Sequence, residues 1–396
     1  MAQALSHIKV LDLGHHIAGP YCSRLLADYG AEVIKVEMPG EGDGARRQGP
    51  FLHDVPHPEK SGLFLYLNYN KRAITLNLKT DSGRKLFKEL VRDADVLVEN
   101  FEPRVMAGLG LDYRALEEIN PRLVMTSISN FGQSGPYRDF KASELVVYAM
   151  GGLMYIIGAY DREPLKHGLS QGQYLAAATA ASATMAAIYA RGDEGVGQHV
   201  DVAIAESIMM GMFMHAGPYG YQGAVMRRQP KVGAIFDDVM TTKDGYIAPV
   251  FYGYVDWDAF SRFMDCPELA DPKFGSLAGR LMNSAEFEAL LLPKIAQWYK
   301  DDLFHAAQEW RFAFGIVNTP EDLVKCPQLQ ERGFFVDIDH PLAGRLTYPG
   351  PPFKMSQTPA QVHRAAPLMG QHNEEVYGAL GYTRADLVAL RERGVI

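Results

Sequence analysis

Polar side chains with possible chemistry stand at the start of an unusual helix. Residues 174–191 are mostly alanine, serine and threonine, which predicts a core helix that needs close neighbours on several sides. Ser170 and Gln173 fall at its N-terminus, where free N–H groups and positive partial charge favour a carboxylate or a developing oxyanion. Gln173, however, is neutral. A plainer interpretation is that Ser170 caps the helix and Gln173 is an ordinary first-turn residue.

Two loops at predicted strand ends combine an amide with an aromatic ring. Asn100 and Phe101 follow one predicted strand, and Asn130 and Phe131 follow the next. Ligands of open α/β sheets bind beyond the carboxyl ends of the strands. The two loops therefore predict a heteroaromatic or amide-bearing ligand at this edge of the sheet.

The first predicted turn, residues 14–20, contains two adjacent histidines. It has no G-x-G-x-x-G pattern, so a nicotinamide or flavin is not expected. His15 and His16 are neighbours in the chain and should point in different directions, which argues against a shared metal ion. We expect them to line the crevice at the strand ends.

Strand and helix patterns alternate along most of the chain. Strands are predicted at residues 8–13, 32–36, 74–78, 95–99, 123–128 and 199–202, and helices at 21–29, 82–91, 113–119, 174–191 and 206–214. This alternation predicts an α/β fold with a parallel sheet covered by helices on both faces.

The pattern changes at residue 235 and returns near residue 331. Residues 242–246 predict a hairpin turn, and Thr319 followed by a proline and two acids predicts a helix start. We therefore expect a large domain made of residues 1–216 and 331–396, a linker at 217–234, and a smaller inserted α+β domain at 235–330.

Composition excludes several classes of partner. The net charge of -8 argues against a nucleic-acid or acidic-membrane partner. The three cysteines have neither disulfide nor metal spacing, and no segment is apolar enough to span a bilayer. A cytoplasmic protein without a bound metal is expected.

Eight short motifs, taken together, resemble the class III coenzyme A transferases. They are LDL at 11–13, AGP at 18–20, GAEVIKVE at 30–37, NKR at 70–72, LVENF at 97–101, INPRL at 119–123, GVGQ at 195–198 and APLMGQH at 366–372. The resemblance covers the full length. It implies a Rossmann-like large domain formed by both chain ends, a smaller inserted domain, and an interlocked, ring-like dimer.

The resemblance also implies residue roles, with coenzyme A or an acyl-CoA as the substrate. The positions that match coenzyme contacts are Ile17, Ala18, Leu76, Asn77, Lys79, Asn100, Phe101 and Lys141. Lys79 and Lys141 would supply positive charge for the phosphates. Glu144 matches an acidic residue that lines the active site.

This sequence departs from the family pattern at the residue that carries the chemistry. In the family an aspartate attacks the acyl-CoA thioester and forms a mixed anhydride, and that position is Gln173 here. An amide has no anionic oxygen and cannot form an anhydride. Met38 replaces a common arginine, and a glycine-rich loop is reduced to Lys231-Val-Gly233.

The departures predict a non-catalytic subunit that works with a homologous catalytic partner. Such an arrangement is similar to that of the succinyl-CoA:(R)-benzylsuccinate CoA-transferases of anaerobic aromatic degradation, whose two subunits differ. One alternative is a self-sufficient transferase with Glu144 as nucleophile, which would form a homodimer instead of pairing with a catalytic partner. Another is an acyl-CoA racemase or epimerase with Ser143 and Gln173 in the acid/base positions, although neither residue titrates usefully. A third is a CoA-binding or architectural protein.

Overall fold

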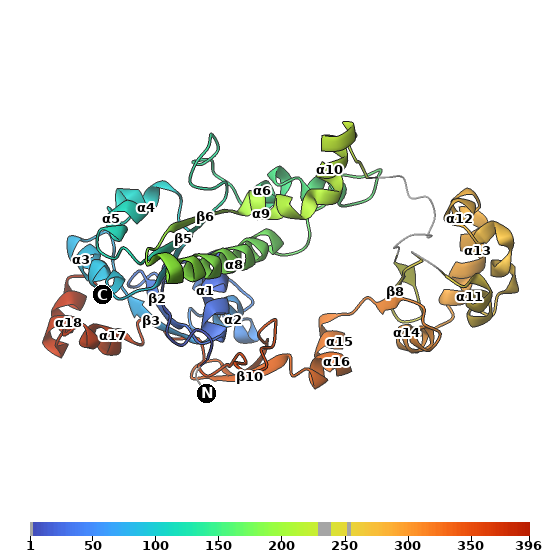
Figure 1. The fold of residues 1–396 in the computed structure, drawn as a ribbon. Coiled ribbons are helices and arrows are strands. Elements are labelled where there is room, and N and C mark those ends of the chain that lie inside the picture. The colour runs from blue at the N-terminus through green and yellow to red at the C-terminus, as the bar shows by residue number, and fades with distance from the viewer. Residues whose placement is uncertain (1–2, 229–238, 252–254) are drawn as a thin grey trace. The chain divides into compact units, whose positions relative to one another are not determined.

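Figure 1 shows the computed structural model of the chain, which describes residues 3–228, 239–251 and 255–396. The chain forms two compact units. The larger unit contains Met1–Ile157, Leu165–Met226 and Arg332–Ile396, and the smaller one contains Gly158–Pro164 and Arg227–Glu331. Both chain ends thus belong to the larger unit. The boundaries expected from the sequence remain predictions.

The larger unit is built on a six-stranded parallel sheet. Its strands are β1 (Lys9–Asp12), β2 (Glu32–Glu37), β3 (Lys71–Thr75), β4 (Val96–Glu99), β5 (Val124–Ser129) and β6 (His199–Ala203). The strand order is β3-β2-β1-β4-β5-β6, and every neighbouring pair is parallel. The order reverses between β1 and β4, which makes the carboxyl ends of these two strands the switch point. The predicted α/β fold is confirmed.

Alternate side chains of the strands enter two separate cores. Val10 and Val98 pack against α1 (Ala18–Asp28), α8 (Gln171–Glu194) and α9 (Ile204–Met209). Leu11 and Leu97 pack on the opposite face, against α3 (Asp81–Val91), α17 (Asn373–Ala379) and α18 (Arg384–Glu392). This follows from the two-residue period of a strand. Figure 1 shows α8 lying along the sheet.

Shorter elements complete the larger unit. They are the helices α2 (Gly62–Asn68), α4 (Arg104–Gly108), α5 (Tyr113–Glu117), α6 (Glu144–Met150), α7 (Leu153–Ile156) and α10 (Phe213–Gln222), the 3-10 helices η1 (Gly44–Arg47), η2 (Leu52–Asp54) and η3 (Met210–Met212), and the hairpin of β10 (Phe335–His340) and β11 (Gly344–Pro349). Among the described residues, no helix is long and apolar enough to cross a membrane.

The smaller unit surrounds an aromatic core. Its strands β7 (Met240–Thr241), β8 (Tyr246–Pro249) and β9 (Phe314–Ile316) form an antiparallel sheet. Its helices are α11 (Trp257–Phe263), α12 (Leu277–Met282), α13 (Ser284–Ile295), α14 (Lys300–Glu309), α15 (Pro320–Lys325) and α16 (Pro327–Glu331), with 3-10 turns η4 (Pro267–Ala270) and η5 (Pro272–Phe274). The predicted hairpin turn joins β7 to β8, and Thr319 begins α15 with a capping box, as expected.

Several expectations need correction. β3 spans Lys71–Thr75 instead of residues 74–78. Its first two residues are charged, and Lys71 can be buried there because its ammonium pairs with Asp12 at 2.8 Å. The helix expected at 206–214 is divided into α9, η3 and α10. Residues 217–222 of the expected linker are the last part of α10, and residues 229–234 lie outside the described chain.

The small-residue helix α8 is packed on most of its surface and exposed along one stripe. Ala176 and Ala180 are fully buried, whereas Tyr189 is 80% exposed and Leu175 37% exposed. The expectation that neighbours pack on several sides is confirmed, because α8 contacts α1, α6, α9, β5 and β6. The small residues let α1 approach closely on one side, and the opposite side of α8 faces solvent.

Candidate functional site

A cavity of about 550 Å³ opens at the carboxyl ends of β4 and β5. Its walls come from the loops after these two strands and from the starts of α6, α8 and α9. The charged and polar side chains in its lining include Asn100, Glu102, Arg104, Ser129, Asn130, Arg138, Asp139, Lys141, Ser143, Glu144 and Gln173. The site can thus offer both cations and carboxylates to a ligand.

Gln173 and Glu144 both line this cavity, although they belong to different helices, α8 and α6. The Glu144 Oε1 atom accepts a hydrogen bond of 2.8 Å from the N–H of Gly172. Its Oε2 atom is buried without a hydrogen-bond partner among the described residues. Ser170 makes no side-chain cap, so the plainer interpretation is wrong at that residue. The Glu144 carboxylate instead occupies the positive end of α8.

Three cations of the cavity are paired with carboxylates. Arg104 donates two hydrogen bonds to Asp139, of 3.0 and 2.6 Å, and Arg138 also pairs with Asp139. The Arg104 and Arg138 guanidinium groups lower the pKa of Asp139 to about 2. Lys141 pairs with Glu102. These pairs are largely exposed, so an incoming phosphate can compete for the cations at little cost.

The predicted coenzyme contacts lie at one edge of the sheet, at several places along it. Asn100, Phe101 and Lys141 line the cavity. The remaining five lie outside its lining: Ile17 and Ala18 after β1, and Leu76, Asn77 and Lys79 after β3. Because all six strands are parallel, their carboxyl ends share this edge.

Asn100 connects two loops at the switch point. Its Oδ1 atom accepts a hydrogen bond of 2.7 Å from the His15 N–H, and its Nδ2 group donates one of 2.9 Å to the His15 carbonyl. Gly19 allows the close approach of Asn100, since a Cβ atom at Gly19 would lie 3.1 Å from the Asn100 Oδ1 atom. The loops after β1 and β4 are thus joined.

The two histidines behave differently from each other. The His15 ring lies 5.5 Å from the Phe101 ring, and burial lowers its pKa. The His16 ring is hydrogen-bonded to Gln48. Neither residue lines the cavity described above, so the expectation that they line the crevice is not met there. In the described part of the chain, no cluster of three or more His, Cys, Asp or Glu side chains could hold a metal ion.

Sequence reasoning missed part of this cavity. The sequence analysis did not single out Arg104, Arg138 or Asp139, and the signal available was that each lies in a segment that follows a predicted strand. Ser129 ends β5, and its hydroxyl is buried without a partner among the described residues. Met38 follows β2 at the same edge and is half-buried, while Lys231-Val-Gly233 lies outside the described residues.

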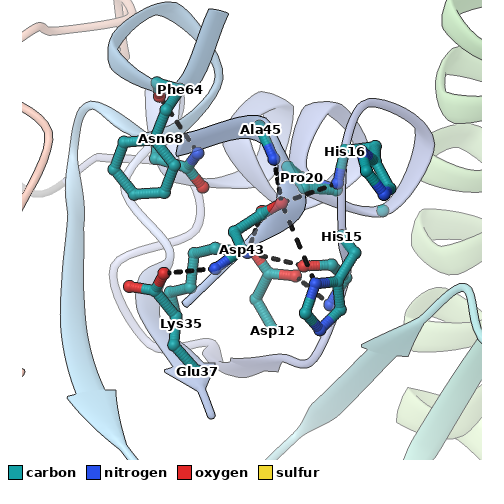
Figure 2. A network of polar contacts seen from close by, with 12 residues as sticks. Asp12, His15, His16, Pro20, Lys35, Glu37, Asp43, Ala45, Phe64 and Asn68 are labelled. Carbon is teal, nitrogen blue, oxygen red and sulfur yellow. Dashed lines mark hydrogen bonds and ion pairs between the residues drawn. The ribbon is translucent and has the colours of Figure 1, made fainter. Parts of the chain in front are cut away.

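The β1–α1 turn, residues 13–17, rests on a buried set of charges (Figure 2). Lys35 lies 2.8 Å from Asp43, and Lys71 lies 2.8 Å from Asp12. All four side chains are fully buried. Burial alone would raise the pKa of Asp43, but the nearby Lys35 ammonium lowers it to about 2. Asp43 is therefore ionised at neutral pH.

Comparison with known proteins gives the same picture over the whole chain. The family profile described as CoA-transferase family III matches residues 5–373. Succinyl-CoA--D-citramalate CoA-transferase of Chloroflexus aurantiacus is 34% identical over 399 residues, which is 99% of this chain and 98% of that protein. The succinyl-CoA:(R)-benzylsuccinate CoA-transferase subunit BbsE of Thauera aromatica is 31% identical over 412 residues, with 100% and 99% covered.

The fold is also similar to a solved structure. A CAIB/BAIF family protein from Brucella suis superimposes with a TM-score of 0.86 at 30% identity, covering 96% of this chain and 100% of that one. The resemblance stated from the eight sequence motifs is therefore confirmed. The chain belongs to CoA-transferase family III, as shown by the family profile that matches residues 5–373 and by relatives that align over its full length. The parallel sheet agrees with this.

Proposed function

We propose that this chain is the non-catalytic subunit of a heteromeric CoA-transferase. The complex moves CoA between an acyl-CoA, here succinyl-CoA, and a carboxylic acid, here (R)-benzylsuccinate. The similarity to subunit BbsE supports the choice of substrates. A homologous cytoplasmic subunit that keeps the aspartate is the catalytic partner, and the two chains interlock. The large domain formed by both chain ends provides the scaffold of the shared site.

A single observation carries this proposal: Gln173 lines the cavity at the start of α8. The transfer needs an anionic oxygen that attacks the thioester carbon, forms the anhydride and expels the CoA thiolate. The side chain of Gln173 has no hydrogen-bond partner among the described residues that could make its amide oxygen more nucleophilic. Its amide oxygen is neutral and far less nucleophilic than a carboxylate.

The surface of the larger unit supports a partner chain. Several large apolar side chains on neighbouring helices are exposed in the single chain: Leu145, Val146 and Met150 on α6, Leu175 and Tyr189 on α8, Met209 on α9, and Tyr219 and Tyr221 on α10. The helix α8 contacts α9, and α6 contacts both. Exposed apolar side chains gathered on adjoining helices are typical of a protein–protein interface.

The coenzyme is proposed to bind along the carboxyl edge of the sheet. Ile17 and Ala18 would contact it at the start of α1, with Leu76, Asn77 and Lys79 after β3 and with Asn100, Phe101 and Lys141 in the cavity. The cations Lys79 and Lys141 would meet its phosphates. Met38, which is half-buried after β2, adds no further charge, and this weakens the site without removing it.

Glu144 gives a second candidate function, a transferase that needs no partner. Its carboxylate lies in the same cavity, and its Oε2 atom has no partner among the described residues. That oxygen could attack a thioester and form the anhydride as an aspartate does. The hydrogen bond from Gly172 to the other oxygen lowers its nucleophilicity, which favours the first proposal. The racemase alternative has Ser143 and Gln173 in the cavity, and neither is a base at neutral pH.

Trapping the acyl intermediate separates these functions. The purified chain is incubated with succinyl-CoA and hydroxylamine, and modified carboxyl groups are located by mass spectrometry. The proposal expects no modified residue in the wild type and a modification at position 173 in Gln173→Asp. A hydroxamate on Glu144, lost in Glu144→Gln, would establish the partner-free transferase. Deuterium uptake at the α-carbon of the acyl group would instead support the racemase.

Purification from native cells tests the partner. The tagged chain should bring down a second family III chain with an aspartate at the start of its corresponding helix. A homodimer of the tagged chain alone, active with succinyl-CoA, would contradict the heteromeric complex.

A further inference from the structure

The β1–α1 turn has a backbone conformation that needs support. His16 has a φ angle of 60°, in the left-handed region that costs a residue with a side chain about 1–2 kcal/mol. Such a conformation persists where the surroundings determine it strongly, and it is concentrated at functional sites. The turn leads directly into α1, whose first residues are Ala18 and Gly19.

Side chains bind five of the six polar backbone groups of residues 14–16, and Lys35, Asp43 and Asn100 come from distant parts of the chain. Asp12 accepts a hydrogen bond of 2.8 Å from the Gly14 N–H, and Lys35 donates one of 2.5 Å to the Gly14 carbonyl. Asn100 binds both the N–H and the carbonyl of His15. Asp43 accepts a hydrogen bond of 2.8 Å from the His16 N–H.

Asp43 has the central place among these groups (Figure 2). Its Oδ1 atom accepts from His16 and, at 2.8 Å, from the N–H of Ala45. Its Oδ2 atom faces the Lys35 ammonium at 2.8 Å. Lys35 in turn reaches Gly14. The buried Asp43–Lys35 pair therefore holds both ends of the segment 14–16: Lys35 binds the Gly14 carbonyl, and Asp43 binds the His16 N–H.

Stability alone gives a weak reason for such a pair. Removing two charges from water is costly, and buried ion pairs often stabilise a fold no better than apolar side chains of similar size would. Their best-supported advantage is to fix one conformation among several. What Asp43 and Lys35 fix is the path of the chain into α1, where the first N–H groups of the helix have no intrahelical partner.

We propose that Asp43 and Lys35 are positioning residues for the coenzyme, because they hold the β1–α1 turn so that the start of α1 faces it. This inference rests on the proposed function, in which Ile17 and Ala18 contact the coenzyme. Neither Asp43 nor Lys35 needs to touch the ligand. Since Asn100 binds His15, the same pair also sets the loop after β4.

The same helix provides a matched control. Asp28, at the other end of α1, is fully buried and pairs with Arg24, with a distance of 3.3 Å between Oδ2 and Nε. It also accepts a hydrogen bond of 3.2 Å from Asn70. Replacing Asp28 or Asp43 by alanine removes a buried carboxylate and takes from a buried cation its nearest carboxylate partner. Only Asp43 contacts the turn.

The experiment measures coenzyme A affinity and thermal stability of the full chain in wild type, Asp43→Ala and Asp28→Ala. Both variants should lose melting temperature. Asp43→Ala should weaken coenzyme A binding about ten- to a hundredfold, as expected when a contact is misplaced by about 1 Å. Asp28→Ala should keep the affinity within about twofold of wild type, which is close to measurement error. Hydrogen exchange at the amides of residues 16–19 should quicken in Asp43→Ala alone.

Each outcome has a defined meaning. Unchanged coenzyme A affinity in Asp43→Ala, or an equal loss in Asp28→Ala, would overturn the inference. If Asp43→Ala does not fold, Asp43→Asn serves instead, because its amide oxygen can still accept the two N–H groups while the Lys35 pairing is lost. A wild type that binds no coenzyme A would refute the coenzyme site of the proposed function, and amide exchange alone would then decide whether Asp43 holds the turn.

Discussion

Replacing Glu99 by glutamine should change how the stability of the larger unit depends on pH. Glu99 ends β4 and is 3% exposed, and its Oε2 atom accepts a hydrogen bond of 2.8 Å from the Phe101 N–H. No cation among the described residues pairs with it. Burial raises the pKa of Glu99 from 4.5 to about 7, against the lowering effect of Ser127 and the Phe101 N–H. Glutamine keeps the acceptor for Phe101 without the charge.

The sign and size of the change in unfolding free energy follow from the linkage between proton binding and folding. The folded state holds the Glu99 proton up to about pH 7, and the unfolded state releases it near pH 4.5. Ionisation of buried Glu99 therefore destabilises the folded state. This destabilisation is absent below about pH 4.5 and complete above about pH 7. At about 1.4 kcal/mol per pH unit, the whole cost is about 3 kcal/mol. Glu99→Gln should gain this amount over wild type as pH rises through the interval.

Urea unfolding at pH values from 5 to 8, followed by circular dichroism, measures the effect. The three tryptophans, Trp257, Trp298 and Trp310, all belong to the smaller unit, so their fluorescence is an internal control that should not respond. A free-energy difference between variant and wild type that stays constant from pH 5 to 8 would refute the reasoning. So would a difference of the opposite sign.

Three further substitutions test other parts of the structure. Glu102→Gln frees Lys141 from an exposed pair and should tighten coenzyme A binding by about two- to fivefold in a titration at low salt, whereas unchanged affinity would exclude a phosphate at Lys141. Gly83→Ala should destabilise by about 1–3 kcal/mol in urea and weaken coenzyme A binding, because a Cβ atom there would lie 2.0 Å from the Asn77 carbonyl oxygen. Thr383→Ala should cost about 1 kcal/mol in the same urea assay by removing the cap of α18, and an unchanged midpoint would contradict it.

Much of the candidate site could be placed from sequence because it follows strand ends. Asn100 and Lys141 were expected near the ligand, and both line the cavity. The structure does not bring Ile17 or Asn77 into the same lining. Which strand-end loops share one cavity depends on the order of strands in the sheet, and β3 is four strands away from β5 in that order. Sequence periodicity gives the strands but not this order.

The sequence by itself determined the alternation that makes a parallel α/β sheet, the capped start of α15, and the neutral side chain at the start of α8. These are local properties, because they depend on the spacing of apolar residues along the chain and on the type of a single side chain. Tertiary structure alone decided that Lys71 begins a buried strand and that Glu144 meets α8 at Gly172. A charge can be buried only where a partner from a distant segment offsets its desolvation, and no local pattern carries that pairing.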